Sequence, residues 1–201
     1  MTLPRRAEEL ARQLLAGPLP RRWAHTQGVA AAARNLSGIL GEHTDLIEAA
    51  AWLHDIGYSP AIAGTGFHPI DGARYLRDTE HADDLLCRLV AHHSFALNEA
   101  VRRGLGDDLA DEFPAPPDEL ADTITYCDMT TGPDGHRLTV DERLAEILAR
   151  YGPDHTVSHA ITASTPQITA AVAHVTERIE AGHGICRPRS AVRAGRGGSG
   201  H

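Results

Sequence analysis

Histidine and aspartate are the residues of this sequence whose types and spacing suggest chemistry. The chain has 13 histidines in 201 residues. In the stretch AWLHDIGYS, His54 and Asp55 stand side by side at the end of an apolar, alanine-rich run. A buried imidazole and a buried carboxylate need polar partners, because unpaired polar groups are costly inside a protein. The rest of the chain must therefore supply those partners.

Helical periodicity directs other polar groups toward the same core. His25, His54 and Asp128 each continue the apolar stripe of a predicted helix at intervals of three or four residues. The adjacent His92 and His93 continue two neighbouring apolar stripes of another helix. We therefore expect these side chains to point inward from four separate helices.

His68, just before Pro69 and a predicted helix start, offers one more imidazole from a loop. Any single one of these groups would be an ordinary buried side chain, but the whole set would be costly without a shared partner. Neutral imidazole and carboxylate are ligands for divalent metal ions, and a carboxylate between two ions can bridge them, which gives Asp55 a use. Seven other histidines have no second donor nearby in the pattern and are not expected to bind metal: His43, His81, His136, His155, His159, His174 and His183.

The elements that must position these residues are all predicted to be helices, and we find no strand alternation and no internal repeat. Helices are expected over residues 4–16, 21–40, 46–56, 70–78, 83–94, 98–105, 118–129, 139–151 and 155–181. Residues 106–117 are expected to be irregular, and Pro166 should kink or split the last helix.

The organisation that follows is one all-α domain over residues 1–186, with a core of about 20–150 and C-terminal helices to about 183. Residues 187–201 lack apolar periodicity and are rich in Gly and Arg, so we predict a disordered tail.

Charge and composition exclude several classes of function. The net charge is −8, and all 19 basic residues are arginines, so a Schiff-base lysine and a P-loop lysine are excluded. An acidic chain has no broad electrostatic footprint for duplex nucleic acid. A small anionic substrate would need local positive charge from arginines or metal ions.

The cysteines and the apolar runs indicate the compartment. Cys87, Cys127 and Cys186 have no metal-finger or CxxC spacing, and their odd number argues against a disulfide framework. The N-terminal residues do not form a secretory signal, and no apolar run is long enough to span a bilayer. We expect a cytoplasmic protein that does not associate with membranes.

The order of these residues resembles the HD superfamily of metal-dependent phosphohydrolases, which is named after a paired His-Asp. The pair appears here as HDIG, residues 54–57. HPIDGARYL, residues 68–76, is similar to the HPxxGAxxL segment of dinuclear members, and AHHS, residues 91–94, is similar to their later histidine segment. The resemblance covers about residues 20–150 and implies an all-helical HD-type bundle.

The resemblance also implies a set of ligands for divalent metal ions, two in the dinuclear members. One metal would be held by His25, His54, Asp55 and Asp128, and the second by Asp55, His68, His92 and, as in members that use both adjacent histidines, His93. Mn, Fe, Co, Ni, Zn and Mg all suit some version of this set. Asp55 and His54 are the expected catalytic residues.

The activity implied is hydrolysis of a phosphate ester or anhydride by a metal-activated water, with a nucleotide or another small phosphorylated metabolite as substrate. The segment after His93 lacks the Glu-Arg-Asp-Gly-like run of the cyclic-dinucleotide branch. One alternative is an HD-type diiron oxygenase, which uses the same ligand types. A second alternative is a non-catalytic sensor that binds a nucleotide or a metal.

Overall fold

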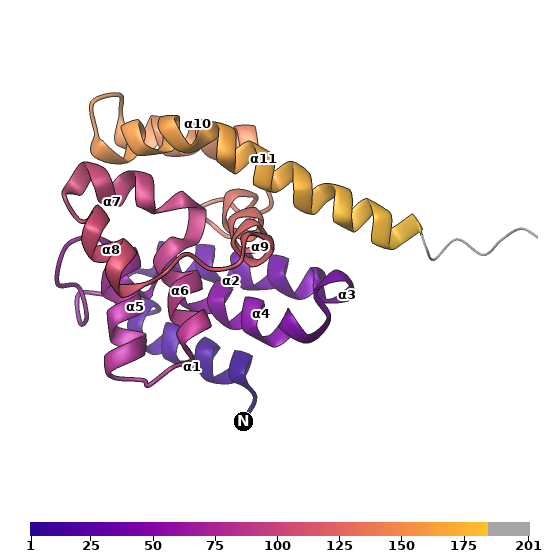
Figure 1. The fold of residues 1–201 in the computed structure, drawn as a ribbon, viewed down its shortest axis with the longest axis horizontal. Helices are drawn as coiled ribbons and strands as arrows, with labels where there is room; N and C mark the ends of the chain where they lie inside the picture. The colour runs from indigo at the N-terminus through magenta and orange to yellow at the C-terminus, as the bar shows by residue number, and fades with distance from the viewer. Residues whose placement is uncertain (185–201) are drawn as a thin grey trace, which may run out of the picture.

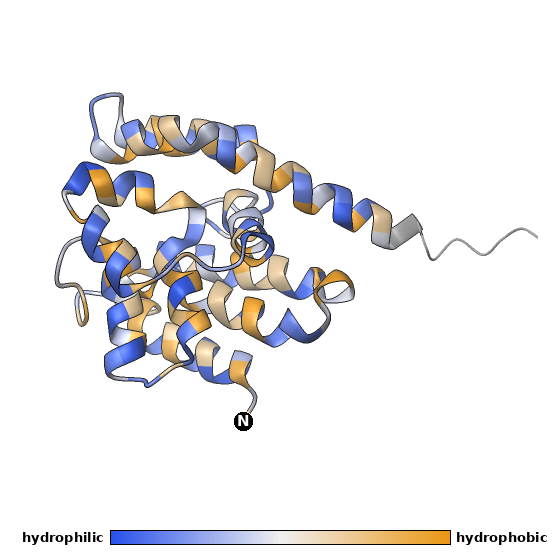
Figure 2. Cartoon of the chain, viewed as in Figure 1, coloured by the Kyte–Doolittle hydropathy of each residue, from blue (hydrophilic) through white to orange (hydrophobic). Residues whose placement is uncertain are grey.

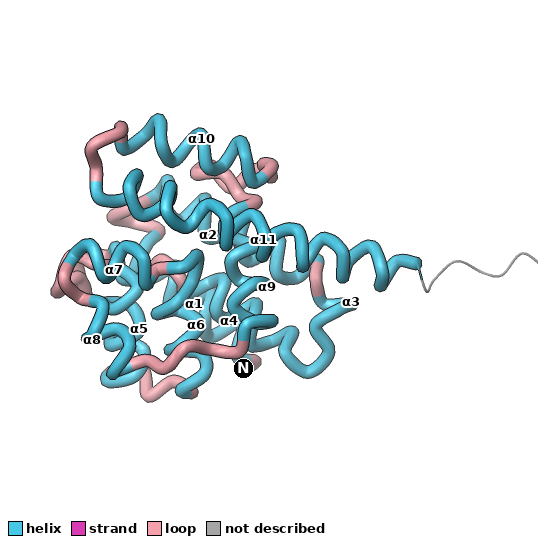
Figure 3. The backbone as a smooth tube through the Cα atoms, turned by 45° about the horizontal axis from the view of Figure 1, so that its top comes forward, coloured by secondary structure: helices cyan, strands magenta, loops and turns pink. Residues whose placement is uncertain are grey.

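Helices make up most of the part of the chain that the computed structural model describes, residues 1–184, and loops connect them (Figures 1 and 3). The α-helices are α1 (Leu3–Leu15), α2 (Pro20–Asn35), α3 (Ser37–Leu40), α4 (Thr44–Leu53), α5 (His68–Asp78), α6 (Asp84–His92), α7 (Leu97–Arg103), α8 (Gly106–Glu112), α9 (Asp118–Met129), α10 (Val140–Tyr151) and α11 (Thr156–Gly184). Short 3₁₀ turns are η1 (Gly41–His43), η2 (Ile56–Tyr58) and η3 (His93–Phe95). No strand occurs within residues 1–184, which confirms the all-α prediction; the predicted tail over 187–201 lies outside the described residues.

The main core forms where α4 packs against α1 and α2. Three consecutive alanines of α4, residues 49–51, have no exposed surface, and such small side chains let helix backbones approach closely. Larger side chains such as Ile47 and Leu15 fill the remaining space, each contributing about 1.5–3 kcal/mol by leaving water. Hydrophobic and hydrophilic residues alternate along these helices, as expected when each helix buries one face (Figure 2).

An aromatic pair ties α2 to α4. The rings of Trp23 and Trp52 are stacked with their centroids 5.5 Å apart and an interplanar angle of 24°. Each tryptophan lies two residues before a histidine of the predicted site, His25 on α2 and His54 after α4. The stack therefore fixes the spacing of the two helix segments that carry these histidines.

Helices α10 and α11 form an upper layer in Figure 1 and share a second, smaller core with the end of α9, built on Met129, Leu144, Ile147 and Ile168. Helix α10 begins at a capping box in which Thr139 accepts a hydrogen bond from the Glu142 backbone N–H and its own N–H donates to the Glu142 carboxylate. The layer packs on α7 and α9. It therefore covers one end of the main bundle.

Three local expectations differ from the structure. Pro166 does not split α11, because buried Ser164 and fully buried Ile168 pack the helix on both sides of the proline. The helix predicted over 21–40 breaks at Leu36, whose backbone angles (φ −90°, ψ 0°) end α2 before α3 begins. The first part of the segment predicted to be irregular, residues 106–112, forms α8, because Leu109 packs into the core with no exposed surface, whereas residues 113–117 are non-helical as predicted.

Length alone does not make α11 a membrane span. Among residues 1–184, no helix combines enough length with enough apolar character to cross a bilayer.

Candidate metal centre

Five separate segments bring the predicted site residues together. Within residues 1–184, the imidazole and carboxylate donors that converge form two clusters, and in each cluster the donor atoms lie within 4.8 Å of one another. We call His25, His54 and Asp128 the first donor group, and Asp55, His68 and His93 the second donor group. All are buried except His68, which is partly exposed.

Asp55 faces both groups. Its Oδ2 lies 3.3 Å from His54 Nε2 and 3.8 Å from His25 Nε2, which belong to the first donor group. Its Oδ1 lies 3.4 Å from His68 Nε2, in the second donor group. The carboxylate therefore offers one oxygen to each group, which is the arrangement a bridging ligand requires.

Backbone carbonyls fix the direction of three imidazoles. The Nδ1 atom of His25 lies 3.0 Å from the Gly132 oxygen, that of His54 lies 2.8 Å from the Ala51 oxygen, and that of His93 lies 2.7 Å from the Val90 oxygen. A carbonyl oxygen can only accept, so each Nδ1 carries a proton, and in the neutral form of each ring the Nε2 is left with the lone pair. This is the tautomer that a metal-binding imidazole adopts when a second group orients it.

A close backbone approach allows the contact of His25 with Gly132. A Cβ atom on Gly28 of α2 would lie 2.5 Å from the Gly135 oxygen, so only glycine lets the loop after α9 lie this close to α2. That loop carries the carbonyl of Gly132 to the Nδ1 of His25.

Three of the inner nitrogens lack partners that would satisfy them, whereas the Nε2 of His25 lies 3.0 Å from Asp128 Oδ1. The Nε2 atom of His54 is fully buried and has no hydrogen-bond partner in the described chain. The Nε2 atoms of His68 and His93 lie only 3.1 Å apart. The Nε2 of His93 can only accept in the neutral ring. Two nitrogens this close therefore need either a proton on the His68 Nε2 or a cation between them. Buried lone pairs beside two carboxylates fit a divalent metal ion.

Charge and burial set the protonation of the carboxylates. Burial would raise the pKa of Asp55, but the Arg22 guanidinium and His54 hold it well below its usual range. Burial likewise opposes the effect of His25 and Arg143 on Asp128, whose pKa also lies well below its usual range. Both carboxylates are therefore ionised at neutral pH, as metal ligands must be.

Most of the imidazoles are held neutral. Burial lowers the pKa of His25 and His93 and takes that of His68 well below its ordinary value. His54 is the exception: burial acts to lower its pKa, but the adjacent Asp55 carboxylate outweighs that effect and raises it. Neutral imidazoles next to ionised carboxylates are the combination that binds divalent metals.

His92 does not join either donor group. Its Nε2 lies 2.5 Å from the carbonyl oxygen of Phe113, on the side of α8. Helix α6 ends at His92, and the backbone of His93 is extended (φ −55°, ψ 145°), so the two rings diverge. The structure thus corrects the expected use of His92: His93 occupies the place in the second donor group.

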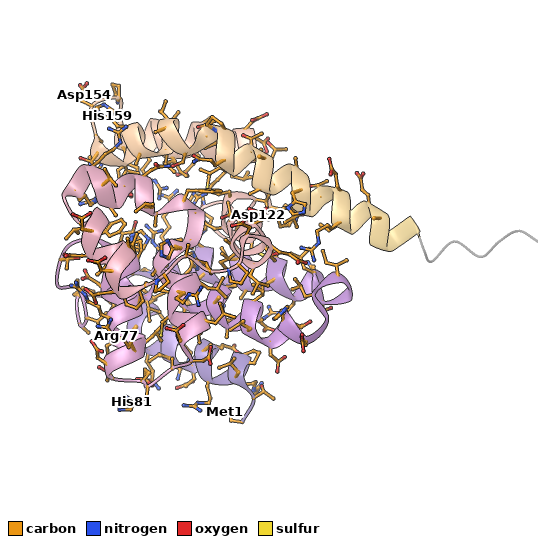
Figure 4. The ribbon with its side chains drawn as sticks, in the orientation of Figure 1. Met1, Arg77, His81, Asp122, Asp154 and His159 are labelled. Carbon is orange, nitrogen blue, oxygen red and sulfur yellow. The ribbon has the colours of Figure 1, made fainter. Side chains whose placement is uncertain are left out.

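Three of the histidines that were not expected to bind metal lie on the surface. His81 and His159 are exposed at the α5–α6 and α10–α11 ends of the molecule, as Figure 4 shows. His174 is exposed and pairs with Asp122, with 2.8 Å between Nδ1 and Oδ2.

Sequence reasoning missed the groups that surround the donors. Arg22 Nη1 donates to Asp55 Oδ2 at 2.8 Å, and its guanidinium lies 4.0 Å from the centroid of the Tyr58 ring. The Tyr58 ring stacks on His68, with centroids 3.9 Å apart. Arg22 precedes His25 by one helical turn, a spacing that could have indicated it. Tyr58 follows the HDIG motif directly but carries no such signal.

Ser94 is another site residue that the sequence pattern did not predict. It has a left-handed backbone (φ 51°), which is uncommon for a residue other than glycine, and its Oγ donates to Asp128 Oδ2 at 2.5 Å. The strained turn directly after His93 therefore also fixes a carboxylate of the first donor group.

A small cavity of about 80 Å³ opens beside the donors, and we call it the cluster cavity. Asp55, His68, His93 and Asp128 line it, together with Arg22. Four side chains of the upper layer also line it: Ile147, Tyr151, Val157 and Ile161. A small molecule that reached the donors would therefore lie between the main bundle and the α10–α11 layer.

Comparisons with known proteins agree with this geometry. The family model described as the HD domain matches residues 22–150, which include His25, His54, Asp55, His68, His93 and Asp128. The curated proteins and the solved structures give no significant match. HD domains bind divalent metals, and the two donor groups described above could hold metal ions. With the family model spanning well over half of its length, this chain belongs to the HD domain family.

Proposed function

We propose that the protein hydrolyses a phosphate ester or anhydride of a nucleotide or another small phosphorylated metabolite. The observation that carries the proposal is the position of Asp55 between two donor groups, with one carboxylate oxygen toward each. HD domains belong to a superfamily of metal-dependent hydrolases, so the family supports the reaction class.

Six side chains would hold two divalent ions. His25, His54 and Asp128 would bind the first, His68 and His93 the second, and Asp55 would bridge them. Four imidazoles with two carboxylates favour Mn, Fe, Co, Ni or Zn over Mg, which prefers a shell of oxygen ligands. Two such ions, when bound, supply Lewis acidity and lower the pKa of water at the site.

The chain's own residues would orient the substrate. Arg22 lines the cluster cavity and can donate to a phosphoryl oxygen while its ring contact with Tyr58 holds the guanidinium in place. The apolar side chains that α10 and α11 contribute to the cavity lining would help to exclude water from it. No nucleophilic side chain is required, because the attacking group in this reaction class is water.

The first experiment combines elemental analysis of the purified protein with a phosphate-release screen in the presence of added metals. We expect about two divalent ions per chain and metal-dependent release of phosphate. Asp55→Asn should retain the helical circular dichroism spectrum but lose both metals and more than ~100-fold of the activity, beyond the loss typical of a residue that only orients a ligand. Full activity in Asp55→Asn would contradict the proposal.

Oxygen dependence separates the hydrolase from the diiron oxygenase. Removal of dioxygen should leave phosphate release unchanged, because hydrolysis needs only water. Product formation that stops under anaerobic conditions would instead favour the oxygenase.

A further inference from the structure

A second cavity, which His25 helps to line, is surrounded by arginines. It has a volume of about 310 Å³, and Arg21, Arg22, Arg143 and Arg150 all line it, together with His25. Among the described residues none that lines it is acidic. We call it the arginine cavity. In a chain of net charge −8, four guanidinium groups around one cavity are an unexpected concentration of positive charge.

The arginines are not fully neutralised by their partners. Arg22 and Arg143 pair with Asp55 and Asp128, which are also the carboxylates of the donor groups. Divalent ions bound to those carboxylates would leave the two guanidiniums with charge to spare.

The other ion pairs are outside the donor groups. Glu146 is shared, with its carboxylate 2.7 Å from Arg143 and 3.3 Å from Arg150. Arg21 pairs with Asp134 at 3.2 Å, and both of these side chains are more than 60% exposed, so water screens the interaction. Glu146 therefore balances Arg150 and part of Arg143, and the exposed Arg21–Asp134 pair does not close the cavity to an anion.

Arg143 is an independent indication of a ligand. It is 97% buried, yet its Nε has no hydrogen-bond partner within residues 1–184. An unpaired donor on a buried charged group is costly. Arg143 lines the cavity, so a bound anion is a natural partner for its guanidinium.

The two cavities share a wall. Arg22, Arg143 and Arg150 line both the arginine cavity and the cluster cavity. An anion held by these guanidiniums would therefore lie next to any group held at the donors. Arginine is suited to this task because its planar guanidinium can bind two oxygens of one phosphate.

We propose that the arginine cavity binds a second phosphate of the substrate, so that the preferred substrates carry two or more linked phosphates. One phosphoryl group would lie at the donor groups and the next on Arg21, Arg22, Arg143 and Arg150. The substrate class is inferred on the basis of the hydrolase proposed above, whereas binding of the anion by the arginines can be measured without turnover.

Binding of inorganic pyrophosphate and of orthophosphate to the full-length protein, followed by isothermal titration calorimetry, tests the proposal. Pyrophosphate should bind at least ~10-fold more tightly than orthophosphate, because it can occupy both positions. Arg150→Gln should weaken pyrophosphate binding by about 10-fold, as expected for loss of one charge-assisted hydrogen bond, and Arg21→Gln should weaken it less because Arg21 is exposed.

Arg103→Gln is the matched control. Arg103 pairs with Glu99 one helical turn away, as Arg150 does with Glu146, and the two arginine side chains are similarly exposed, at 30% and 27%. Arg103 lines neither cavity. Arg103→Gln should bind pyrophosphate like the unmodified protein, and equal weakening by the two substitutions would overturn the proposal. Equal affinity of the unmodified protein for pyrophosphate and orthophosphate would also overturn it.

A comparison of substrates separates this proposal from the hydrolase proposal. With a diphosphate ester, Arg150→Gln should raise KM about 10-fold and leave kcat nearly unchanged, whereas with the matching monophosphate ester the rise in KM should be several-fold smaller. If no ester is hydrolysed but pyrophosphate binding still depends on Arg150, the anion site stands and the hydrolase proposal fails. If hydrolysis occurs without any effect of Arg150→Gln on KM or on binding, the hydrolase proposal stands and the anion site fails.

Discussion

The two donor groups differ in how their imidazoles are held. In the first, His25 and His54 are almost completely buried, and backbone carbonyls fix both rings. In the second, only His93 has such a carbonyl contact, while the side chain of His68 is 14% exposed and lies against the Tyr58 ring. The first donor group is therefore the more rigid, and the second lies nearer to the cluster cavity, where His68 and His93 are both part of the lining.

This difference predicts that the first donor group binds metal more tightly than the second. The largest effect is expected when one imidazole is removed from each group. His54→Ala should abolish binding of the tighter metal, and with it more than ~100-fold of the activity, because its partners are fixed and cannot move to compensate. His93→Ala should lose only the weaker metal, so about one ion per chain should remain. Elemental analysis after dialysis measures both, and equal losses in the two variants would contradict the comparison.

His92→Ala is the matched control for His93→Ala, since the two residues are adjacent in the chain. The His92 ring contacts the Phe113 carbonyl rather than the donors. We expect His92→Ala to keep both metals and most of the activity. Loss of a metal in His92→Ala, with retention in His93→Ala, would restore the assignment expected from sequence.

Tyr58 tests whether its ring holds His68 in place. Tyr58→Leu should weaken the second metal and the activity by about 10-fold, since an aromatic pair contributes about 0.5–1.5 kcal/mol. Tyr58→Phe keeps the ring and should stay within about twofold of the unmodified protein. A metal titration resolves the two sites. An equal effect of both substitutions would indicate that the hydroxyl matters rather than the stacking.

The smallest effect is expected far from both groups, where Arg74 and Arg77 pair with Glu112. Glu112→Gln should lower the free energy of unfolding by about 0.5 kcal/mol, as is usual for a partly exposed ion pair, and should leave metal content unchanged. Hydrogen bonds from Arg74 lower the pKa of Glu112 against the opposing effect of burial. The contribution is therefore present above the unfolded pKa of about 4.3 and is lost as pH falls through the lowered folded value. Denaturant titrations at pH 7 and at pH 3 should show a larger difference between the two proteins at pH 7 than at pH 3.

The sequence predicted the helices and most of the donors because both follow the helical period. His25 and Asp128 lie within regular helices, so apolar spacing places their side chains correctly. His92 and His93 lie where α6 ends, and there the backbone angles of single residues, rather than the period of 3.6, decide where each ring points. Arg143 reaches the site through a contact between distant segments, and the stacking of Tyr58 on His68 depends on how η2 packs against α5; a pattern along the chain contains neither.

The glycine of the HDIG motif illustrates the same limit. A Cβ atom on Gly57 would lie 2.0 Å from the carbonyl oxygen of His68, so only glycine allows η2 to touch the start of α5. The motif can be read in the sequence, but the reason for its glycine appears only when His68 is seen packed against it.

The tryptophan stack between α2 and α4 is an intrinsic spectroscopic probe of the site. The chain has only two tryptophans, and both belong to this stack, each two residues from a histidine of the first donor group. Intrinsic emission and near-ultraviolet dichroism would therefore come mainly from one point of the molecule. A shift of α2 relative to α4 during loading of the site would be visible without an attached dye.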